Sequence, residues 1–171
     1  FNYAYCSAPQ CSPSRAAILT GRNIWELEEA GTHRASFPAK FRVYPDVLEE
    51  AGYHVGYTGK PWSPGDWSER ARNPAGPAYN KRTLVPPAEH IAKIDYAGNF
   101  RDFLDARPAG APFAFWYGGH EPHRDYQEGI GQASGKNLDD IDMADTLFLP
   151  DVDIVKSDLL DYGYEIEWFD R

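Results

Sequence analysis

The sequence predicts a layered α/β fold. Segments with apolar residues at helical spacing alternate with short apolar runs that end in glycine, and this alternation is typical of such folds. The chain has 171 residues, of which 42% are apolar and 15% aromatic, a composition that favours a globular protein over a disordered one. We expect one domain with one sizeable core.

The first predicted helix follows Cys11. Ser12 is a good N-cap, Pro13 suits the first helical position, and Gly21 suits the C-terminal cap. Cys11 is then expected just before a helix N-terminus, where free N–H groups and the helix dipole favour an anion. Arg15, one turn along, adds a forked cation suited to an oxyanion. These residues alone are also compatible with a simple buried thiol.

The middle of the chain predicts a helix, a strand and a long loop. Residues 44–51 have apolar residues at helical spacing, and Gly52 suits the position after the helix. Residues 53–58 are predicted as a strand that ends in a turn at Gly59. Residues 61–87 are rich in Pro, Gly, Asn and Trp, which predicts an irregular loop of the kind that is often functional.

The second half predicts two further helices around another strand. Residues 96–107 are predicted as a helix with three large apolar residues on one face. Residues 113–117 form an aromatic run typical of a buried strand, which leads into a loop over residues 118–120. Residues 157–171 are predicted as a helix with Ser157 as its N-cap. This helix has no stop signal, and we expect both ends of the chain to be cut from a longer domain.

Composition argues against several functions. The formal net charge is −9, and the absence of a Lys/Arg cluster argues against a nucleic-acid partner. No apolar run approaches the length that crosses a bilayer, so no membrane partner is expected. The two cysteines, Cys6 and Cys11, are compatible with a disulfide or with buried thiols. No signal-peptide pattern follows Phe1, so the chain carries no direct information on export.

Residues 11–22, CSPSRAAILTGR, carry the most informative pattern. They match the signature Cys-x-Pro-Ser-Arg followed by Leu-Thr-Gly-Arg at every defining position, and the chain therefore resembles the formylglycine-dependent sulfatases. The resemblance implies that a dedicated maturation enzyme oxidises Cys11 to formylglycine. In that family the hydrated aldehyde provides one hydroxyl that attacks sulfur and a second whose deprotonation expels sulfate and restores the aldehyde. Cys6 lies outside the motif, and we interpret it as structural.

Three further segments resemble the same family. Residues 1–5 resemble the strand and turn that precede the signature. Residues 51–60, AGYHVGYTGK, resemble the element whose lysine contacts the substrate sulfate and the formylglycine. The resemblance assigns this role to Lys60, and an ammonium suits it. Residues 112–124 resemble the strand and loop that bring a sulfate-binding histidine into the site, and the alignment of the loop identifies it as His123.

The resemblance implies further roles in this loop. His123 is expected to donate a hydrogen bond to a sulfate oxygen or to protonate the leaving group. Arg124 is expected to bind substrate beside it, and His120 is interpreted as structural. Taken alone, the two histidines are also compatible with loop structure, and Lys60 with a solvated surface lysine.

The later segments are most similar to the heparan N-sulfatase (sulfamidase) branch. Residues 120–124, 148–151 and 158–162 follow the order found there: an H-x-P-H-R loop, a Leu-Pro pair with an acidic residue, and a helix. The resemblance implies an alkaline-phosphatase-like fold with a mostly parallel central sheet, of which residues 1–171 form part of the N-terminal catalytic domain. It also implies Ca²⁺ as cofactor, a sulfated sugar as substrate, and a periplasmic, secreted or lysosomal location.

Two departures from the family pattern stand out. Trp62 lies where many members have a histidine after the Gly-Lys pair. The Asp-Asp and Asp-Asn or Asp-His pairs that hold the family's metal have no counterpart here, so Cys11, as formylglycine, is the one expected metal ligand. The adjacent Asp139 and Asp140 occur in the wrong order, and we interpret them as solvated surface.

The resemblance implies hydrolysis of a sulfate ester or sulfamate. Two alternatives remain: a phosphonate or phosphate-ester hydrolase of the same superfamily, and a non-catalytic sulfated-glycan-binding homologue, which Trp62 favours. We expect this chain alone to be inactive, because a Ca²⁺ site needs six or more oxygen ligands.

Overall fold

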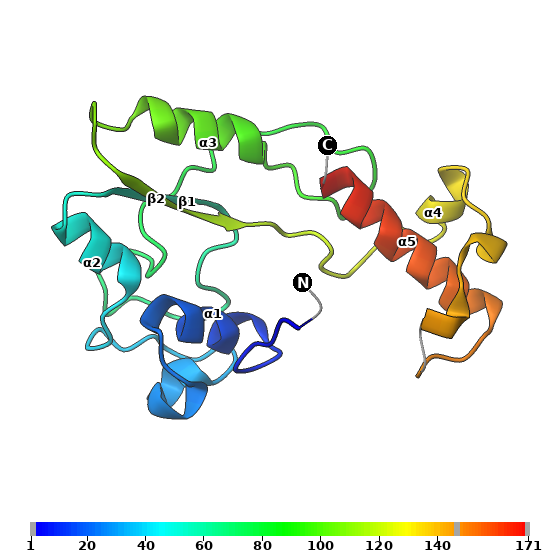
Figure 1. The fold of residues 1–171 in the computed structure, drawn as a ribbon, viewed down its shortest axis with the longest axis horizontal. Coiled ribbons are helices and arrows are strands. Elements are labelled where there is room, and N and C mark those ends of the chain that lie inside the picture. The colour runs from blue at the N-terminus through cyan, green and yellow to red at the C-terminus, as the bar shows by residue number, and fades with distance from the viewer. Residues whose placement is uncertain (1–2, 146–147, 170–171) are drawn as a thin grey trace. The chain divides into compact units, whose positions relative to one another are not determined.

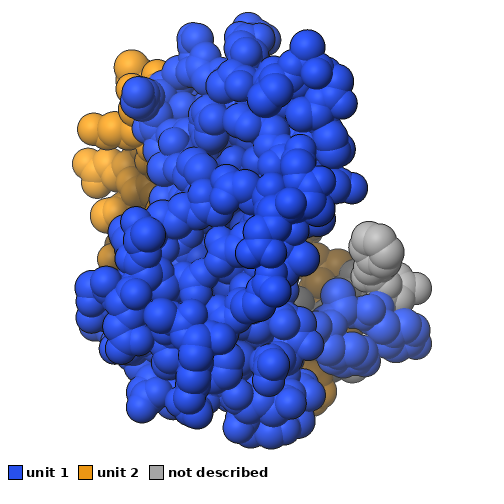
Figure 2. All heavy atoms as spheres, turned by 90° about the vertical axis from the view of Figure 1, so that its left-hand side faces the viewer, with its two compact units in different colours: residues 1–82, 95–118 blue, residues 83–94, 119–171 orange. Residues whose placement is uncertain are grey.

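The computed structural model describes residues 3–145 and 148–169. The chain divides into two compact units (Figure 2). Unit 1 comprises residues 1–82 and 95–118, and unit 2 comprises residues 83–94 and 119–171.

Unit 1 is built around two parallel strands. Strand β1 (His54–Gly59) pairs with β2 (Phe113–Gly118) in a register that runs from His54 opposite Phe113 to Gly59 opposite Gly118. Helix α3 (Tyr96–Asp105) precedes β2 in the chain, with Asp95 as its N-cap. The two strands lie within one residue of their predicted bounds, and the predicted helix over residues 96–107 is also present.

The two faces of the strand pair contact different helices (Figure 1). On one face, the ring of Phe103 from α3 packs on His54 and Phe115, with centroid distances of 4.4 and 4.5 Å. On the other face, Tyr57 and Trp116 pack with the core that lies beside α1. This division follows from the two-residue period of a strand, which points successive side chains to opposite faces.

The remaining elements of unit 1 close that second face. Helix α1 (Cys11–Thr20) is followed by two 3₁₀ turns, η1 (Ile24–Glu26) and η2 (Glu28–Gly31), and then by α2 (Tyr44–Glu50). Between them lies a core with several fully buried members: Leu19, Leu27, Ala30, Phe37 and Trp62. Residues 61–82 form no helix or strand, as the loop prediction for residues 61–87 requires.

The start of α1 differs from the prediction. The helix begins at Cys11 and its N-cap is Gln10, whose extended backbone (φ −140°) accepts the N–H of Ser14. The prediction of Ser12 as N-cap was therefore wrong, because its side chain is directed into long-range contacts instead. Gly21 caps the other end in the left-handed conformation (φ 68°), as predicted.

The chain before α1 also differs from expectation. Residues 3–6 form no strand, and a bend over residues 7–10 leads into the helix. Tyr3 and Tyr5 are 81% and 90% exposed, so no packing in the described part of the chain holds this segment extended.

Strand β2 is less buried than its aromatic composition suggests. Phe113 and Tyr117 are 43% and 45% exposed, so the prediction of a buried strand was wrong. Their rings line an apolar cavity of about 420 Å³ together with Tyr96 and Phe100 of α3. Helix α3 therefore covers this face of β2 only in part.

Unit 2 is helical. Its elements are α4 (Ile130–Ala133), the 3₁₀ turns η3 (Leu138–Asp140) and η4 (Met143–Asp145), and α5 (Asp153–Phe169), with α4 and η3 packed on α5. Asp139 and Asp140 are exposed, as predicted.

The last helix also begins earlier than predicted. Helix α5 starts at Asp153, four residues before Ser157, which was wrongly predicted as the N-cap. The Ser157 hydroxyl instead donates to Gln132 Oε1 at 3.2 Å. The predicted end over residues 170–171 lies outside the described residues. Within residues 3–145 and 148–169, no helix is long and apolar enough to span a membrane.

Candidate functional site

Cys11 is the first residue of α1 and is half-buried. The Lys60 ammonium donates a hydrogen bond to its sulfur, with Nζ and Sγ 3.3 Å apart. Arg15 follows one turn along the same helix. These three side chains, predicted from two separate segments of the sequence, therefore meet at the N-terminus of α1 in unit 1. That end of a helix favours negative charge because its first N–H groups lack partners within the helix.

The cations around Cys11 change the acidity of its thiol. Burial alone would raise the pKa of Cys11, but hydrogen bonding and charge from Lys60, and then from Arg15, outweigh burial and lower the pKa below its ordinary value of 9.0. A thiol at a helix N-terminus beside a cation is generally acidic for the same reason. The sulfur atom of Cys11 thus lies where the protein stabilises an anion.

The two cysteines are not linked. Both are free thiols, and Cys6 is exposed, with its thiol donating to the carbonyl of Ala8 at 3.2 Å. Neither the disulfide nor the pair of buried thiols considered for the sequence is present. Cys11 is therefore chemically available.

The backbone of Lys60 is held directly after β1. Its N–H donates to Gly118 O at 2.6 Å, and its carbonyl accepts from Trp116 Nε1 at 3.1 Å. Asn80 fixes the preceding residue, because its Oδ1 accepts the Gly59 N–H at 2.7 Å and its Nδ2 donates to Gly59 O at 3.2 Å. These contacts aim the lysine from the carboxyl end of the strand, where ligands bind in α/β sheets.

The first turn of α1 is held from the other side. The buried Ser12 hydroxyl accepts the Arg34 N–H at 3.1 Å and lies 3.4 Å from His33 Nδ1. Trp62, which is fully buried, donates from Nε1 to the Ser12 carbonyl at 3.0 Å. The residue that departs from the family pattern therefore contacts the backbone beside Cys11 from within the core.

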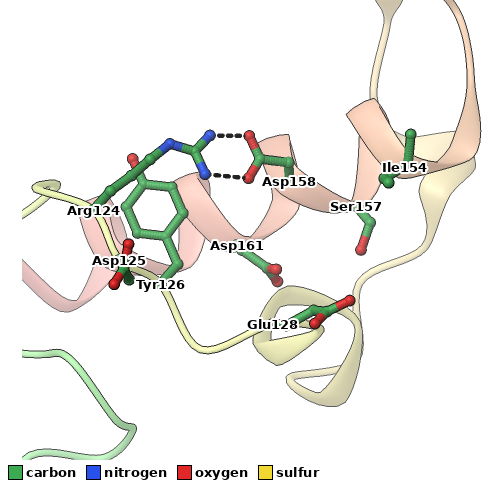
Figure 3. Close-up of a pocket in the computed structure, with 8 residues that line it drawn as sticks. All are labelled: Arg124, Asp125, Tyr126, Glu128, Ile154, Ser157, Asp158 and Asp161. Atoms are coloured by element: carbon green, nitrogen blue, oxygen red, sulfur yellow. Dashed lines mark hydrogen bonds and ion pairs between the residues drawn. The ribbon is translucent and has the colours of Figure 1, made fainter.

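The two remaining predicted site residues belong to unit 2. His123 is exposed, and its Nδ1 donates to the carbonyl of Arg124. The Arg124 guanidinium forms a two-pronged ion pair with Asp158 of α5, with Nη1 and Oδ1 2.7 Å apart, and lies over the ring of Tyr126 (Figure 3). The neighbouring Asp158 carboxylate is the main cause of a raised pKa for Arg124.

A cavity of about 270 Å³ lies beside this ion pair (Figure 3). Its charged lining consists of one guanidinium and four carboxylates: Arg124, Asp125, Glu128, Asp158 and Asp161. An excess of carboxylates disfavours an anionic ligand. The charge around Cys11 is thus better suited to sulfate than the charge of this cavity.

Sequence reasoning missed several residues that support the site. Asn80 and Trp116 each fix the lysine segment, yet nothing in the sequence distinguishes them from other loop and strand residues. Trp62 was noted as a departure, but its contact with Ser12 spans 50 residues of sequence. Side-chain contacts of such range have no local sequence signal.

Comparisons with known proteins indicate the family of this chain. Residues 1–170 match the family described as Sulfatase. Human N-sulphoglucosamine sulphohydrolase is 30% identical over 72% of this chain and 24% of its own length, so the chain spans about a quarter of that relative. No solved structure gives a significant match. The family match, with a parallel strand pair flanked by helices, confirms the alkaline-phosphatase-like α/β class. The chain therefore belongs to the sulfatase family.

Proposed function

We propose that the protein containing this chain hydrolyses a sulfate ester or sulfamate through a formylglycine derived from Cys11. The observation that carries the proposal is the contact between Cys11 and Lys60, whose Sγ and Nζ atoms are 3.3 Å apart at the N-terminus of α1. A nucleophile between two cations and a helix N-terminus suits attack on an anionic sulfate.

The side chains of this site have distinct roles in the proposal. The hydrated formylglycine supplies one hydroxyl that attacks sulfur, with cleavage of the bond between sulfur and the leaving group. Its second hydroxyl then loses its proton and forms the aldehyde C=O, and the C–O bond to sulfate breaks so that sulfate leaves. The attacking oxygen would be attached to Cβ, as Sγ is in the thiol, so the Lys60 ammonium is in reach to stabilise it. Arg15 would bind sulfate oxygens from one turn along the helix. Both cations would then stabilise charge that develops on the oxygens in the transition state.

His123 and Arg124 are proposed as further substrate-binding residues, as the family resemblance implies. An exposed histidine can donate to a sulfate oxygen or protonate the leaving group. Arg124 would first have to exchange Asp158 for substrate, since its guanidinium is already paired. The human relative's name specifies N-sulphoglucosamine, and we propose an N-sulfated or O-sulfated sugar as the substrate here.

The family resemblance also implies Ca²⁺ as cofactor. Among the residues that the structure describes, no group of three or more His, Cys, Asp or Glu side chains is arranged to hold a metal ion. These residues therefore do not by themselves fit a Ca²⁺ site, which needs six or more oxygen ligands. The resemblance to formylglycine-dependent sulfatases also supports a maturation enzyme as partner and a periplasmic, secreted or lysosomal location.

The test is sulfate release by the full-length enzyme, produced with and without the maturation enzyme. We expect an aldehyde at Cys11 by peptide mass spectrometry, and turnover of N-sulfated or O-sulfated glucosamine only when it is present. Cys11→Ala should abolish turnover, and Lys60→Met should lower kcat/KM by roughly 10²–10³-fold, as removal of one preorganised donor does elsewhere. Lys40→Met is the matched control, because Lys40 is 59% exposed and pairs with Glu28 on the surface.

Other outcomes would favour the alternatives. If the enzyme hydrolyses a phosphonate or phosphate ester and neither sulfated sugar, it is a phosphonate or phosphate-ester hydrolase of the same superfamily. Sulfated-sugar binding without turnover, despite the aldehyde, would indicate a binding protein. Unchanged turnover by Cys11→Ala would contradict the proposal outright.

A further inference from the structure

Two tryptophan side chains each hold a backbone carbonyl at the site. Trp62 Nε1 donates to Ser12 O at 3.0 Å, next to Cys11, and Trp116 Nε1 donates to Lys60 O at 3.1 Å. One indole N–H thus bonds to Lys60 itself, and the other bonds to Ser12, the residue that follows Cys11. An indole nitrogen can only donate a hydrogen bond. In both bonds the indole therefore donates, the carbonyl oxygen accepts, and the carbonyl is fixed in place.

Trp62 is itself firmly held. Its side chain is fully buried, and its ring packs edge-on against Phe37 with centroids 5.1 Å apart. Its backbone exchanges two hydrogen bonds with the Asn73 side chain, of 3.3 and 2.9 Å. The indole therefore has little freedom to follow the Ser12 carbonyl if α1 shifts.

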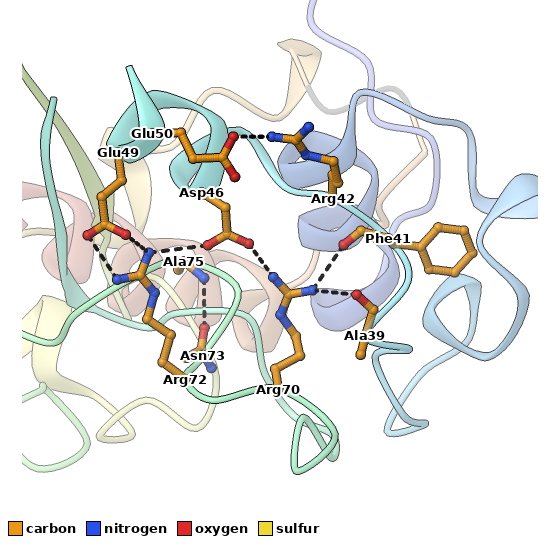
Figure 4. Close-up of polar contacts among 10 residues, drawn as sticks. All are labelled: Ala39, Phe41, Arg42, Asp46, Glu49, Glu50, Arg70, Arg72, Asn73 and Ala75. Carbon is orange, nitrogen blue, oxygen red and sulfur yellow. Dashed lines mark hydrogen bonds and ion pairs between the residues drawn. The ribbon is translucent and has the colours of Figure 1, made fainter. Parts of the chain in front are cut away.

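Ion pairs attach the loop that carries Trp62 to α2 (Figure 4). Arg70, whose side chain is 10% exposed, pairs with Asp46 and donates to the Phe41 carbonyl at 2.9 Å. Arg72 pairs with Glu49 at 2.6 Å. The loop has an irregular conformation, but these contacts fix it at several points. Trp62 therefore donates its hydrogen bond to α1 from a segment whose position is itself fixed.

The backbone of Lys60 is also held in close contact with the end of β2. The Lys60 N–H donates to Gly118 O, and a Cβ atom built on Gly118 would lie 2.0 Å from Lys60 O. Only glycine permits this approach. Trp116 lies two residues before Gly118 on β2 and packs against the same core as Trp62. The core thereby links the backbone of α1 to the backbone of Lys60.

We propose that Trp62 and Trp116 are positioning residues that set the separation between the Cys11 side chain and the Lys60 ammonium. Trp62 acts through Ser12, and Trp116 acts through the Lys60 carbonyl. In this chain the residue at the family's usual histidine position thus supports the nucleophile from behind. The inference deepens the proposed function, but the geometry is testable on the unmodified thiol without any turnover.

The experiment compares alkylation of Cys11 by iodoacetamide in protein produced without the maturation enzyme. Peptide mass spectrometry follows Cys11, and the exposed Cys6 in the same molecule is the reference. The rate at pH 7 is divided by the rate at a pH where both thiols are fully ionised. This ratio removes changes in access and reports the thiolate fraction, because the thiolate is the nucleophile.

The variants are Trp62→Phe and Trp116→Phe, which keep an aromatic ring and lose the N–H donor. We expect each to lower the Cys11 ratio by about twofold, because a weaker Lys60 contact leaves less thiolate, with no change at Cys6. Trp25→Phe is the matched control, since Trp25 is 77% exposed, and should change neither thiol.

Two results would overturn the inference. One is a Trp62→Phe protein with a lower melting temperature and an unchanged Cys11 ratio, which would show that the indole contributes packing alone. The other is an unchanged ratio for Trp116→Phe, which decides the matter if Trp62→Phe fails to fold. If both tryptophan variants lower the Cys11 ratio as expected, but the matured full-length enzyme has no sulfatase activity, the inference stands and the proposed function is rejected.

Discussion

Replacing Lys60 by methionine removes the ammonium from the Cys11 sulfur while keeping an unbranched side chain. In the native structure the Nζ and Sγ atoms are 3.3 Å apart. Lys60 lowers the pKa of Cys11 more than Arg15 does, against the opposing effect of burial. We therefore expect Lys60→Met to raise the pKa of Cys11 and to slow its alkylation at neutral pH.

The size of the effect follows from the strength of the lost contact. A hydrogen bond to a charged group contributes about 1.5–3 kcal/mol, and the lower end applies to a half-exposed sulfur. Since about 1.4 kcal/mol is a factor of ten, the thiolate population at pH 7 should fall about tenfold. A less acidic thiol forms a more nucleophilic thiolate, with a Brønsted coefficient of about 0.4–0.5, which returns about threefold in rate. The net expectation is alkylation slower by about three- to fourfold.

The assay is alkylation of the unmodified protein as a function of pH, read at Cys11 and Cys6. The pKa of Cys11 is lowered, so its advantage in thiolate over an ordinary thiol is present below pH 9.0, the ordinary value, and disappears as the pH rises through it. Lys60→Met should remove most of that advantage, and Lys40→Met should not. An unchanged Cys11 profile in Lys60→Met would refute the view that this contact sets the electrostatics of the site.

Three further predictions concern other parts of the structure. Asp46→Ala should lower the free energy of unfolding in chemical denaturation by about 2 kcal/mol, because it removes the carboxylate partner of the nearly buried Arg70 guanidinium. Glu50→Ala breaks an exposed ion pair and should lower the same free energy by no more than about 0.5 kcal/mol. Equal costs would contradict the role assigned to burial. Burial, and then a neighbouring carboxylate, raise the pKa of Glu165, so its contribution to stability is present below pH 4.5 and lost as the pH rises through the raised value. Glu165→Gln should flatten this loss in thermal melts at a series of pH values, and an unaltered pH dependence would argue against it. Asp158→Ala should tighten the binding of inorganic sulfate measured by calorimetry, because it releases Arg124; unchanged binding would argue against Arg124 as a sulfate contact.

Much of the fold follows from local patterns in the sequence. Apolar periodicity placed β1, β2 and α3 within two residues of their observed bounds. Gly21 ends α1 as predicted, because the left-handed conformation needed there costs glycine little. These features depend on interactions between residues near one another in the chain, and sequence reports such interactions directly.

The predicted chemistry of the site also came largely from sequence. The signature around Cys11 and the Gly-Lys pair at the end of β1 pointed to a thiol, a guanidinium and an ammonium, and Cys11, Arg15 and Lys60 lie together at the start of α1. His123 and Arg124 belong to unit 2, and their roles remain predictions.

Only the tertiary structure decided which of several possible hydrogen-bond partners each polar side chain uses. Ser12 and Ser157 both have the residue type of an N-cap, yet their hydroxyls contact residues 22 and 25 positions away. Arg124 pairs with a carboxylate 34 residues later, and Trp62 reaches a carbonyl 50 residues earlier. A polar side chain has several possible partners of similar energy, and packing of the rest of the chain selects among them. The sequence determined which groups form the Cys11 site, and the tertiary structure determined what holds them at the distance that their chemistry requires.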